Sequence, residues 1–272
     1  MKPLLTRLPL LNYALAGLLA VVLLTRGQSD TTSLLIVSSI VMFAVCWSSA
    51  IHLLGGRAAL HFVLIAVVVG WGAEQLGSSY GWFFGSYKYT NVLGPTVGDV
   101  PVVIPLMWFA LTYIGYVIAN LIVWQAPSDG IASLGQDIAM SLLAAMIVTA
   151  YDLAADPYMV FVLKAWVMEM KDGWWFGETV QGFFGWMLTS FVIVFGFRLS
   201  LRHRAPAAAL PVARRHVMVP LFIYGANMAF QMAAGHPVET RTIAFFAMGI
   251  PLLSALCGYA RWQRPLTAKG EL

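Results

Sequence analysis

The chain has 272 residues, of which 60% are hydrophobic and only 10% are charged. Soluble domains average about 25% charged residues, so this composition excludes an ordinary soluble protein and indicates one integral membrane domain over residues 1–272. The formal net charge is +4 and the basic residues fall in short connections, so no nucleic-acid partner is expected. Cys46 and Cys257 lie inside apolar runs without a CxxC motif, which argues against a disulfide framework or a zinc site.

Eight apolar runs are long enough to cross a bilayer, since a spanning helix needs about 20 mostly apolar residues. They predict an all-α, polytopic membrane bundle of about eight transmembrane helices, with seven as the alternative count. The first run is interpreted as a retained helix, because no small-residue cleavage site follows it. The runs are Leu8–Leu24, Ser33–Leu53, Ala58–Leu76, Val102–Trp124, Ile131–Tyr151, Gly182–Leu199, His216–Ala234 and Thr242–Arg261.

Two segments between these runs are unusual. Residues 158–170 are apolar but too short to span, and they predict a short helix at the interface or folded back into the bundle. Residues 77–101 are rich in glycine and aromatic side chains and too irregular for a spanning helix. Irregular backbone at a membrane is tolerated where it lines a cavity, so a cavity wall is favoured, with an interfacial aromatic belt as the alternative.

Gly81-Trp-Phe-Phe-Gly85 is echoed by Gly173-Trp-Trp-Phe-Gly177, which suggests two loops around one centre.

The end of the fifth run carries two carboxyl groups, on Asp152 and Asp156. They are four residues apart, so on a continuing helix they would share one face. An ionisable group at bilayer depth costs about 2.5–3.5 kcal/mol, which makes a functional role the first hypothesis. A structural alternative for Asp156 is the N-cap of a new helix, with Pro157 at its first position. Glu74, near the end of the third run, is expected at the same membrane face.

Three acids among aromatic side chains suit chemistry that passes through a carbocation. A carboxylic acid in a poorly hydrated cavity can donate a proton, and an aromatic face attracts a cation by about 2 kcal/mol or more when desolvated. Glu74, Asp152 and Asp156 are therefore the candidate catalytic residues. The sequence has no P-loop and no histidine box, so neither a metal nor a cofactor is expected. The aromatic candidates for substrate binding are Trp82, Phe84, Tyr87, Trp174, Trp175 and Phe176.

Many of these residues belong to an ordered pattern that resembles the membrane carotenoid biosynthesis family. The resemblance covers about residues 60–200, which we interpret as the motif-bearing catalytic core, and it adds Tyr89, Trp108 and Trp186 to the candidates for substrate binding. The chain departs from the family at Glu178-Thr-Val-Gln181, where a proline and an asparagine are frequent, and this departure bears on substrate specificity. The pattern comprises Glu74, Gly81-x-x-x-Gly85-x-Tyr87-x-Tyr89, Gly98-Asp-Val-Pro101, Ile104-Pro-Leu-x-Trp108, Asp152-Leu-Ala-Ala-Asp-Pro157, Gly173-x-x-x-Gly177 and Gly185-Trp186.

The resemblance implies addition of water across the terminal trisubstituted double bond of an acyclic carotenoid, which gives a tertiary alcohol. The substrate would come from membrane lipid, and other enzymes of the carotenoid pathway would be candidate partners. Two other classes stay open. One is a membrane transporter or a lipid- or isoprenoid-binding protein that uses the acids as a proton relay. The other is a prenyl-transferring enzyme, which the pair Asp152 and Asp156 suggests by its spacing.

The basic residues predict the orientation in the cell membrane, because cytoplasmic loops carry an excess of Lys and Arg. With both termini in the cytoplasm, eleven of the 16 basic residues lie on that side, including those of the linker at 201–212. The loops at 80–100 and 170–181 then face the opposite side. A cysteine introduced at Ala208 should react with an impermeant reagent only from the cytoplasmic side, and reaction only from outside would reverse the orientation.

Overall fold

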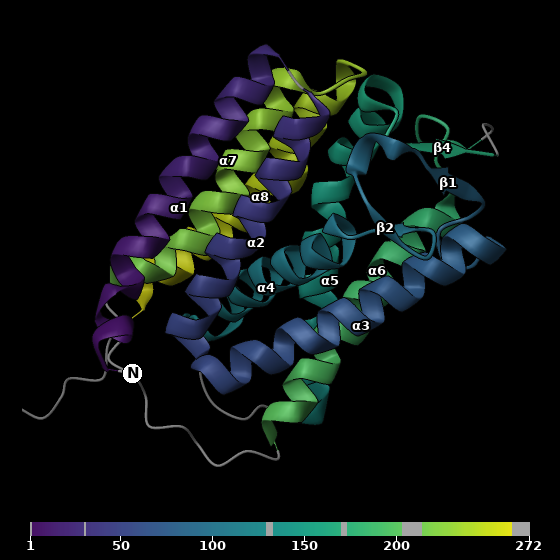
Figure 1. The fold of residues 1–272 in the computed structure, drawn as a ribbon. Coiled ribbons are helices and arrows are strands. Elements are labelled where there is room, and N and C mark those ends of the chain that lie inside the picture. The colour runs from purple at the N-terminus through teal and green to yellow at the C-terminus, as the bar shows by residue number, and fades with distance from the viewer. Residues whose placement is uncertain (1, 30, 129–132, 170–172, 203–213, 263–272) are drawn as a thin grey trace, which may run out of the picture.

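The computed structural model describes residues 2–29, 31–128, 133–169, 173–202 and 214–262. Over these ranges the chain forms eight long helices, each long and apolar enough to cross a membrane (Figure 1). The predicted all-α polytopic bundle with eight spans is confirmed, while most of the predicted linker at 201–212 lies outside the described residues. The helices are α1 (Lys2–Gln28), α2 (Thr32–Leu54), α3 (Gly56–Tyr80), α4 (Val103–Trp124), α5 (Leu134–Tyr158), α6 (Val180–Arg202), α7 (Met218–Ala234) and α8 (Glu239–Arg261).

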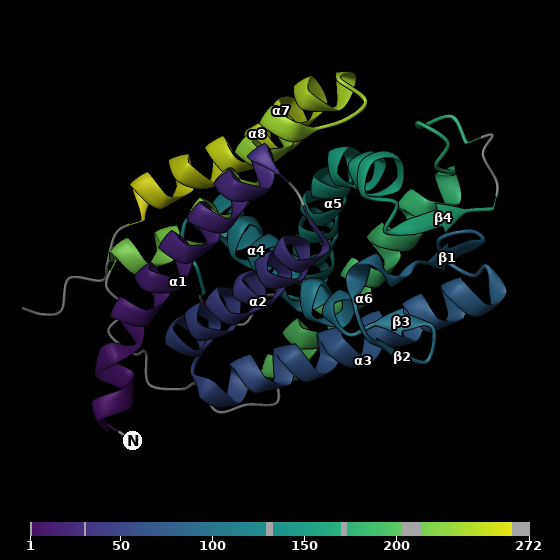
Figure 2. The same cartoon turned by 45° about the horizontal axis from the view of Figure 1, so that its top comes forward.

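Helix α4 lies at the centre of the bundle and packs against α2, α3, α5 and α8. Its sequence is apolar almost all round, which is typical of a fully buried helix. Trp108, Phe109 and Tyr113 accordingly have almost no exposed surface. In Figures 1 and 2, α1, α2, α7 and α8 form one group on one side of α4, and α3 and α6 lie on the other side.

Helix α5 continues through the acidic pair, so the alternative interpretation of Asp156 as the N-cap of a new helix is wrong. Pro157 lies inside this helix, although a proline there has no N–H to donate to the carbonyl of Leu153. The indole Nε1 of Trp175 donates a hydrogen bond to that carbonyl instead, at 3.0 Å. The helix therefore tolerates the proline because a side chain from a later loop replaces the missing backbone donor.

The short helix predicted over residues 158–170 is present only in its first part, and residue 170 lies outside the described residues. After α5 the chain makes a π-helical turn, η2 (Met159–Leu163), and Lys164 then adopts a positive φ of 53°. The next residues form strand β4 (Trp166–Met168), which pairs antiparallel with β1 (Tyr87–Tyr89). The competing strand pairing thus ends the helix. Because alternate residues of a strand share a face, β1 points Tyr87 and Tyr89 in the same direction.

The remaining short elements belong to the connections. Strands β2 (Thr96–Val97) and β3 (Val100–Pro101) form a small antiparallel hairpin, and Figure 2 shows it lying over α3. Single turns of 3₁₀ helix occur at η1 (Asn91–Leu93) and η3 (Arg214–Val217). The first glycine–aromatic loop contacts the start of α6, where the side-chain amide of Gln181 donates to the carbonyl of Gly81 at 3.0 Å.

Two glycines of α3 make room for aromatic side chains. A Cβ atom at Gly70 would lie 2.7 Å from the ring of Trp108, and a Cβ atom at Gly77 would lie 2.8 Å from the ring of Phe84. Neither position accepts a larger residue without displacing its aromatic neighbour. A Cβ atom at Gly72, on the same helix, would meet nothing within 4 Å.

Gly70→Ala should therefore lower the free energy of unfolding by about 1–3 kcal/mol, the usual cost of overpacking a core. The matched change Gly72→Ala should be neutral or stabilising, because alanine favours a helix interior over glycine by about 0.5–1 kcal/mol. Thermal unfolding of both variants in detergent measures the difference. Equal effects of the two substitutions would contradict the close approach of α3 to Trp108.

Candidate active site

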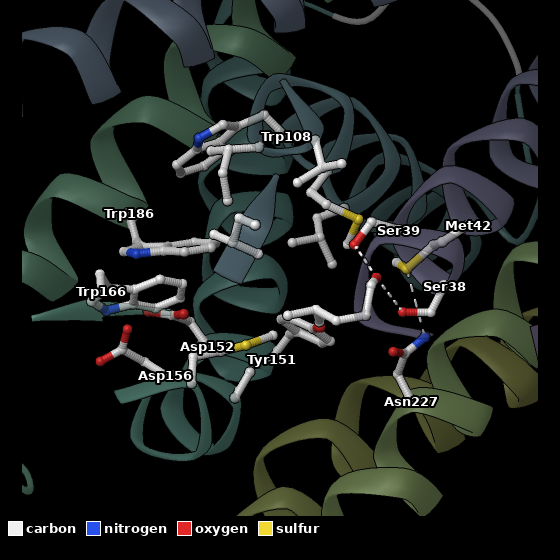
Figure 3. A pocket seen from close by; sticks show the side chains of 18 of the residues that line it. Ser38, Ser39, Met42, Trp108, Tyr151, Asp152, Asp156, Trp166, Trp186 and Asn227 are labelled. Atoms are coloured by element: carbon white, nitrogen blue, oxygen red, sulfur yellow. Dashed lines mark hydrogen bonds between the residues drawn. The ribbon is translucent and has the colours of Figure 1, made fainter. Parts of the chain in front are cut away.

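A cavity lies among α1, α2, α4, α5 and α7 and the strands β1 and β4, and it encloses about 1040 Å³ including its open mouth. Most of the wall is apolar, with polar groups gathered at two ends (Figure 3). Asp152 and Asp156 lie at one end beneath tryptophan rings, and Ser38 and Asn227 lie at the other.

Glu74 is buried in this wall, with 4% of its surface exposed, and three side chains donate hydrogen bonds to it. The Tyr87 and Tyr89 hydroxyls donate to Oε2, the second at 2.7 Å, and the Trp108 indole donates to Oε1 at 2.9 Å. Burial and the Glu74 charge raise the pKa of both tyrosines, so both phenols remain protonated donors. An ionised carboxylate can only accept hydrogen bonds, and the three donors around Glu74 satisfy the needs of such a carboxylate. The donors come from β1 and α4, so the loop and the central helix fix the position of Glu74 together.

A second acidic group combines Asp152 and Asp156 of α5 with Glu178, which lies just before α6. All three are at most 5% exposed. Asp156 interacts electrostatically with the Glu178 carboxyl group and the Trp166 indole. Buried carboxyl groups that are close together disfavour ionisation of both, so the pair favours a state that holds a proton.

Glu178 is the member of this pair in which the protonated form is favoured. Burial and the charges of Asp156 and Asp152 raise the pKa of Glu178, which disfavours its ionised form. Within the described part of the chain, Oδ2 of Asp152 and Oε2 of Glu178 have no hydrogen-bond partner. The cavity wall therefore favours a protonated carboxyl group beside carboxyl oxygens that are free to bind another group.

Aromatic rings cover the acidic end of the cavity. In Figure 3 the rings of Trp166 and Trp186 lie on the same side as Asp152 and Asp156. The Trp186 ring also contacts Trp108, with ring centroids 4.6 Å apart and an interplanar angle of 36°. These faces surround the carboxyl groups with the electron-rich surfaces that attract cations.

The structure brings most of the predicted site residues together and leaves four outside the cavity. Trp82 and Trp174 are 57% and 69% exposed and suit the interfacial alternative. Trp175 binds the Leu153 carbonyl, and Phe176 does not line the cavity. The residues that line it are Glu74, Asp152, Asp156, Phe84, Tyr87, Tyr89, Trp108 and Trp186.

Among the lining residues that were not predicted as site residues are Glu178 and Trp166, which lie at the acidic end of the cavity. The signal that could have identified Glu178 was its position immediately after the second glycine–aromatic motif, because that motif echoes the loop after α3. Trp166 lay in a segment that was predicted to be helical. Among the described residues, no group of three or more His, Cys, Asp or Glu side chains is arranged to hold a metal ion.

Comparison with known proteins gives one family and one curated relative. A family model described as "Carotenoid biosynthesis protein" matches residues 31–254. Over 154 residues the chain is 32% identical to bisanhydrobacterioruberin hydratase of Haloarcula japonica. This alignment covers 54% of the chain and 49% of the relative, so the match spans about half the length of that protein. No solved structure matches the chain.

The buried proton of Glu178 should make stability depend on pH. A carboxyl group whose pKa is raised on folding contributes to the free energy of unfolding. This contribution is complete below the unfolded pKa of about 4.3, and it falls as the pH rises above that value. Between about pH 5 and 8 the free energy of unfolding of the wild-type protein should fall by up to about 1.4 kcal/mol per pH unit relative to that of Glu178→Gln.

Unfolding midpoints measured in detergent at several pH values test this expectation. The control is Glu169→Gln, since Glu169 is half exposed and faces Lys88 at 3.6 Å. If wild type and Glu178→Gln have the same pH dependence, Glu178 does not hold the proton.

Proposed function

The chain belongs to the carotenoid biosynthesis protein family, and from that premise we propose that it is a hydratase. It adds water to the terminal trisubstituted double bond of an acyclic carotenoid and forms a tertiary alcohol. The observation that carries this proposal is the set of buried carboxyl groups of Asp152, Asp156 and Glu178 in a wall of tryptophan rings, with Glu74 in the same wall. The curated relative, named as a hydratase, supports the same class of reaction.

Protonation of the alkene is the first step. The apolar wall binds the hydrocarbon end of the substrate and places its double bond at the acidic end of the cavity. The proton shared by Glu178 and Asp156 is transferred to the less substituted alkene carbon, which leaves a tertiary cation on the other carbon. Asp152 stands on the same face of α5 as Asp156 and adds negative charge or a second proton donor beside the reacting carbon.

The cation is stabilised by the rings of Trp108, Trp166 and Trp186 and by the carboxylates that remain ionised. Water then forms a bond to the cationic carbon. Glu74 has about four acceptor positions and uses three for its own donors, so one remains to accept the proton that water releases. Return of that proton to the acid pair restores the site, and no bound metal or cofactor takes part.

Substitution of the carboxyl groups tests these roles. In cells that accumulate an acyclic carotenoid, the wild-type chain should convert the pigment to a more polar tertiary alcohol. Glu74→Gln, Asp152→Asn and Asp156→Asn keep the side-chain shape but remove the proton chemistry, and each should lower conversion by about 10²-fold or more. Pigment chromatography measures conversion, normalised to the amount of chain in the membrane.

Glu169→Gln is the matched control and should convert pigment as the wild type does, because its carboxyl group is exposed and outside the cavity. Normal conversion by all three cavity variants would remove the carboxyl groups from the mechanism. A wild-type chain that binds or moves the pigment without changing it would instead identify a binding protein or transporter.

A further inference from the structure

A second, smaller chamber adjoins the cavity at the end of α7. It has room for about one water molecule. It shares five wall residues with the cavity, so only side chains separate the two spaces. The shared residues are Arg26, Tyr151, Ala155, Met159 and Asn227, and the others are Tyr158, Phe230, Gln231 and Gly235.

Gln231 supplies the chamber with an unused acceptor. The side chain is 4% exposed, and its Nε2 donates to the Tyr151 carbonyl at 3.2 Å. Its Oε1 has no hydrogen-bond partner in the described part of the chain. A buried amide oxygen without a partner costs about 1–3 kcal/mol, so a ligand that donates a hydrogen bond to it would be stabilised.

The other walls restrict what can bind there. The rings of Tyr158 and Phe230 meet edge to face with centroids 5.7 Å apart, and the Arg26 guanidinium lies 4.7 Å from the Phe230 centroid. Arg26 also donates to the Ser38 hydroxyl at 3.0 Å, which fixes its position. A small neutral hydrogen-bond donor fits this space, whereas a carotenoid does not.

We propose that this chamber, the Gln231 chamber, holds the water molecule that captures the cation. The proposal rests on the proposed hydration. A hydrocarbon substrate displaces bulk water from the main cavity, yet each turnover consumes one water. Tyr151 and Ala155 line both spaces and directly precede Asp152 and Asp156 in α5, so the chamber meets the cavity along the helix that carries the acids. Its oxygen bonds to the tertiary carbon, and its released proton goes to a carboxylate of the site.

Deuterium exchange separates water capture from protonation. A cation that water does not capture returns a proton to a carboxylate and becomes an alkene again. In heavy water this reversal leaves deuterium in recovered substrate without forming alcohol. A variant that cannot hold the water should therefore keep exchange and lose hydration, whereas a variant that cannot protonate should lose both.

The test uses the full chain in membrane vesicles with an acyclic carotenoid in heavy water. Gln231→Met keeps the length of the side chain but removes the amide oxygen, and it should lower alcohol formation about tenfold or more while deuterium still enters the substrate. The control is Gln28→Met, at the exposed end of α1, which should match the wild type. Thermal unfolding checks that each variant is folded.

A second variant, Gln231→Asn, shortens the side chain and enlarges the chamber. With methanol added, it should form more methyl ether relative to alcohol than the wild type does, because the enlarged chamber admits methanol. Three results would each overturn the proposal. The first is unchanged hydration in Gln231→Met, and the second is a parallel loss of hydration and exchange in that folded variant. The third is an unchanged ether-to-alcohol ratio in Gln231→Asn. If the folded wild-type chain gives neither alcohol nor exchange, the proposed hydration itself fails and the water site fails with it.

Discussion

The burial of four carboxyl groups in one cavity wall of a membrane protein is the constraint on which the rest of this structure depends. Each isolated charge in such a place is expensive, so each acid needs donors or a shared proton. Glu74 obtains three donors from β1 and α4, and Asp156 interacts electrostatically with Glu178 and Trp166. The pairing of β1 with β4 is what brings these tyrosines and this tryptophan to the same wall.

The same constraint connects the irregular parts of the fold to its chemistry. Trp175 replaces the donor that Pro157 lacks, so α5 extends far enough to carry both aspartates on one face. The π-helical turn after α5 then redirects the chain, and Trp166 enters the cavity wall from β4. Insertions of this kind into helices occur frequently at functional sites. Here the turn ends the helix directly after the acid-bearing segment.

Much of the helical architecture could be predicted because a membrane imposes a length and a composition on each span. The shared face of Asp152 and Asp156 followed from helical spacing alone. The end of α5 could not be predicted locally, since Asp-Pro is also a helix-start signal and the compensating indole of Trp175 comes from a later loop. Glu178 was missed for a related reason, because its pairing with Asp156 depends on tertiary contact. Trp82 and Phe84 belong to one motif, yet Phe84 is buried and Trp82 is exposed.

The source of the product hydroxyl tests the central claim most directly. The wild-type chain would be supplied with an acyclic carotenoid in isotope-labelled water under unlabelled oxygen gas, and then with the labels reversed. Mass spectrometry of the alcohol should show that its oxygen comes from water, and formation of the alcohol should continue without air. Label that arrives from oxygen gas would contradict acid-catalysed hydration and the roles given to Glu74, Asp152, Asp156 and Glu178.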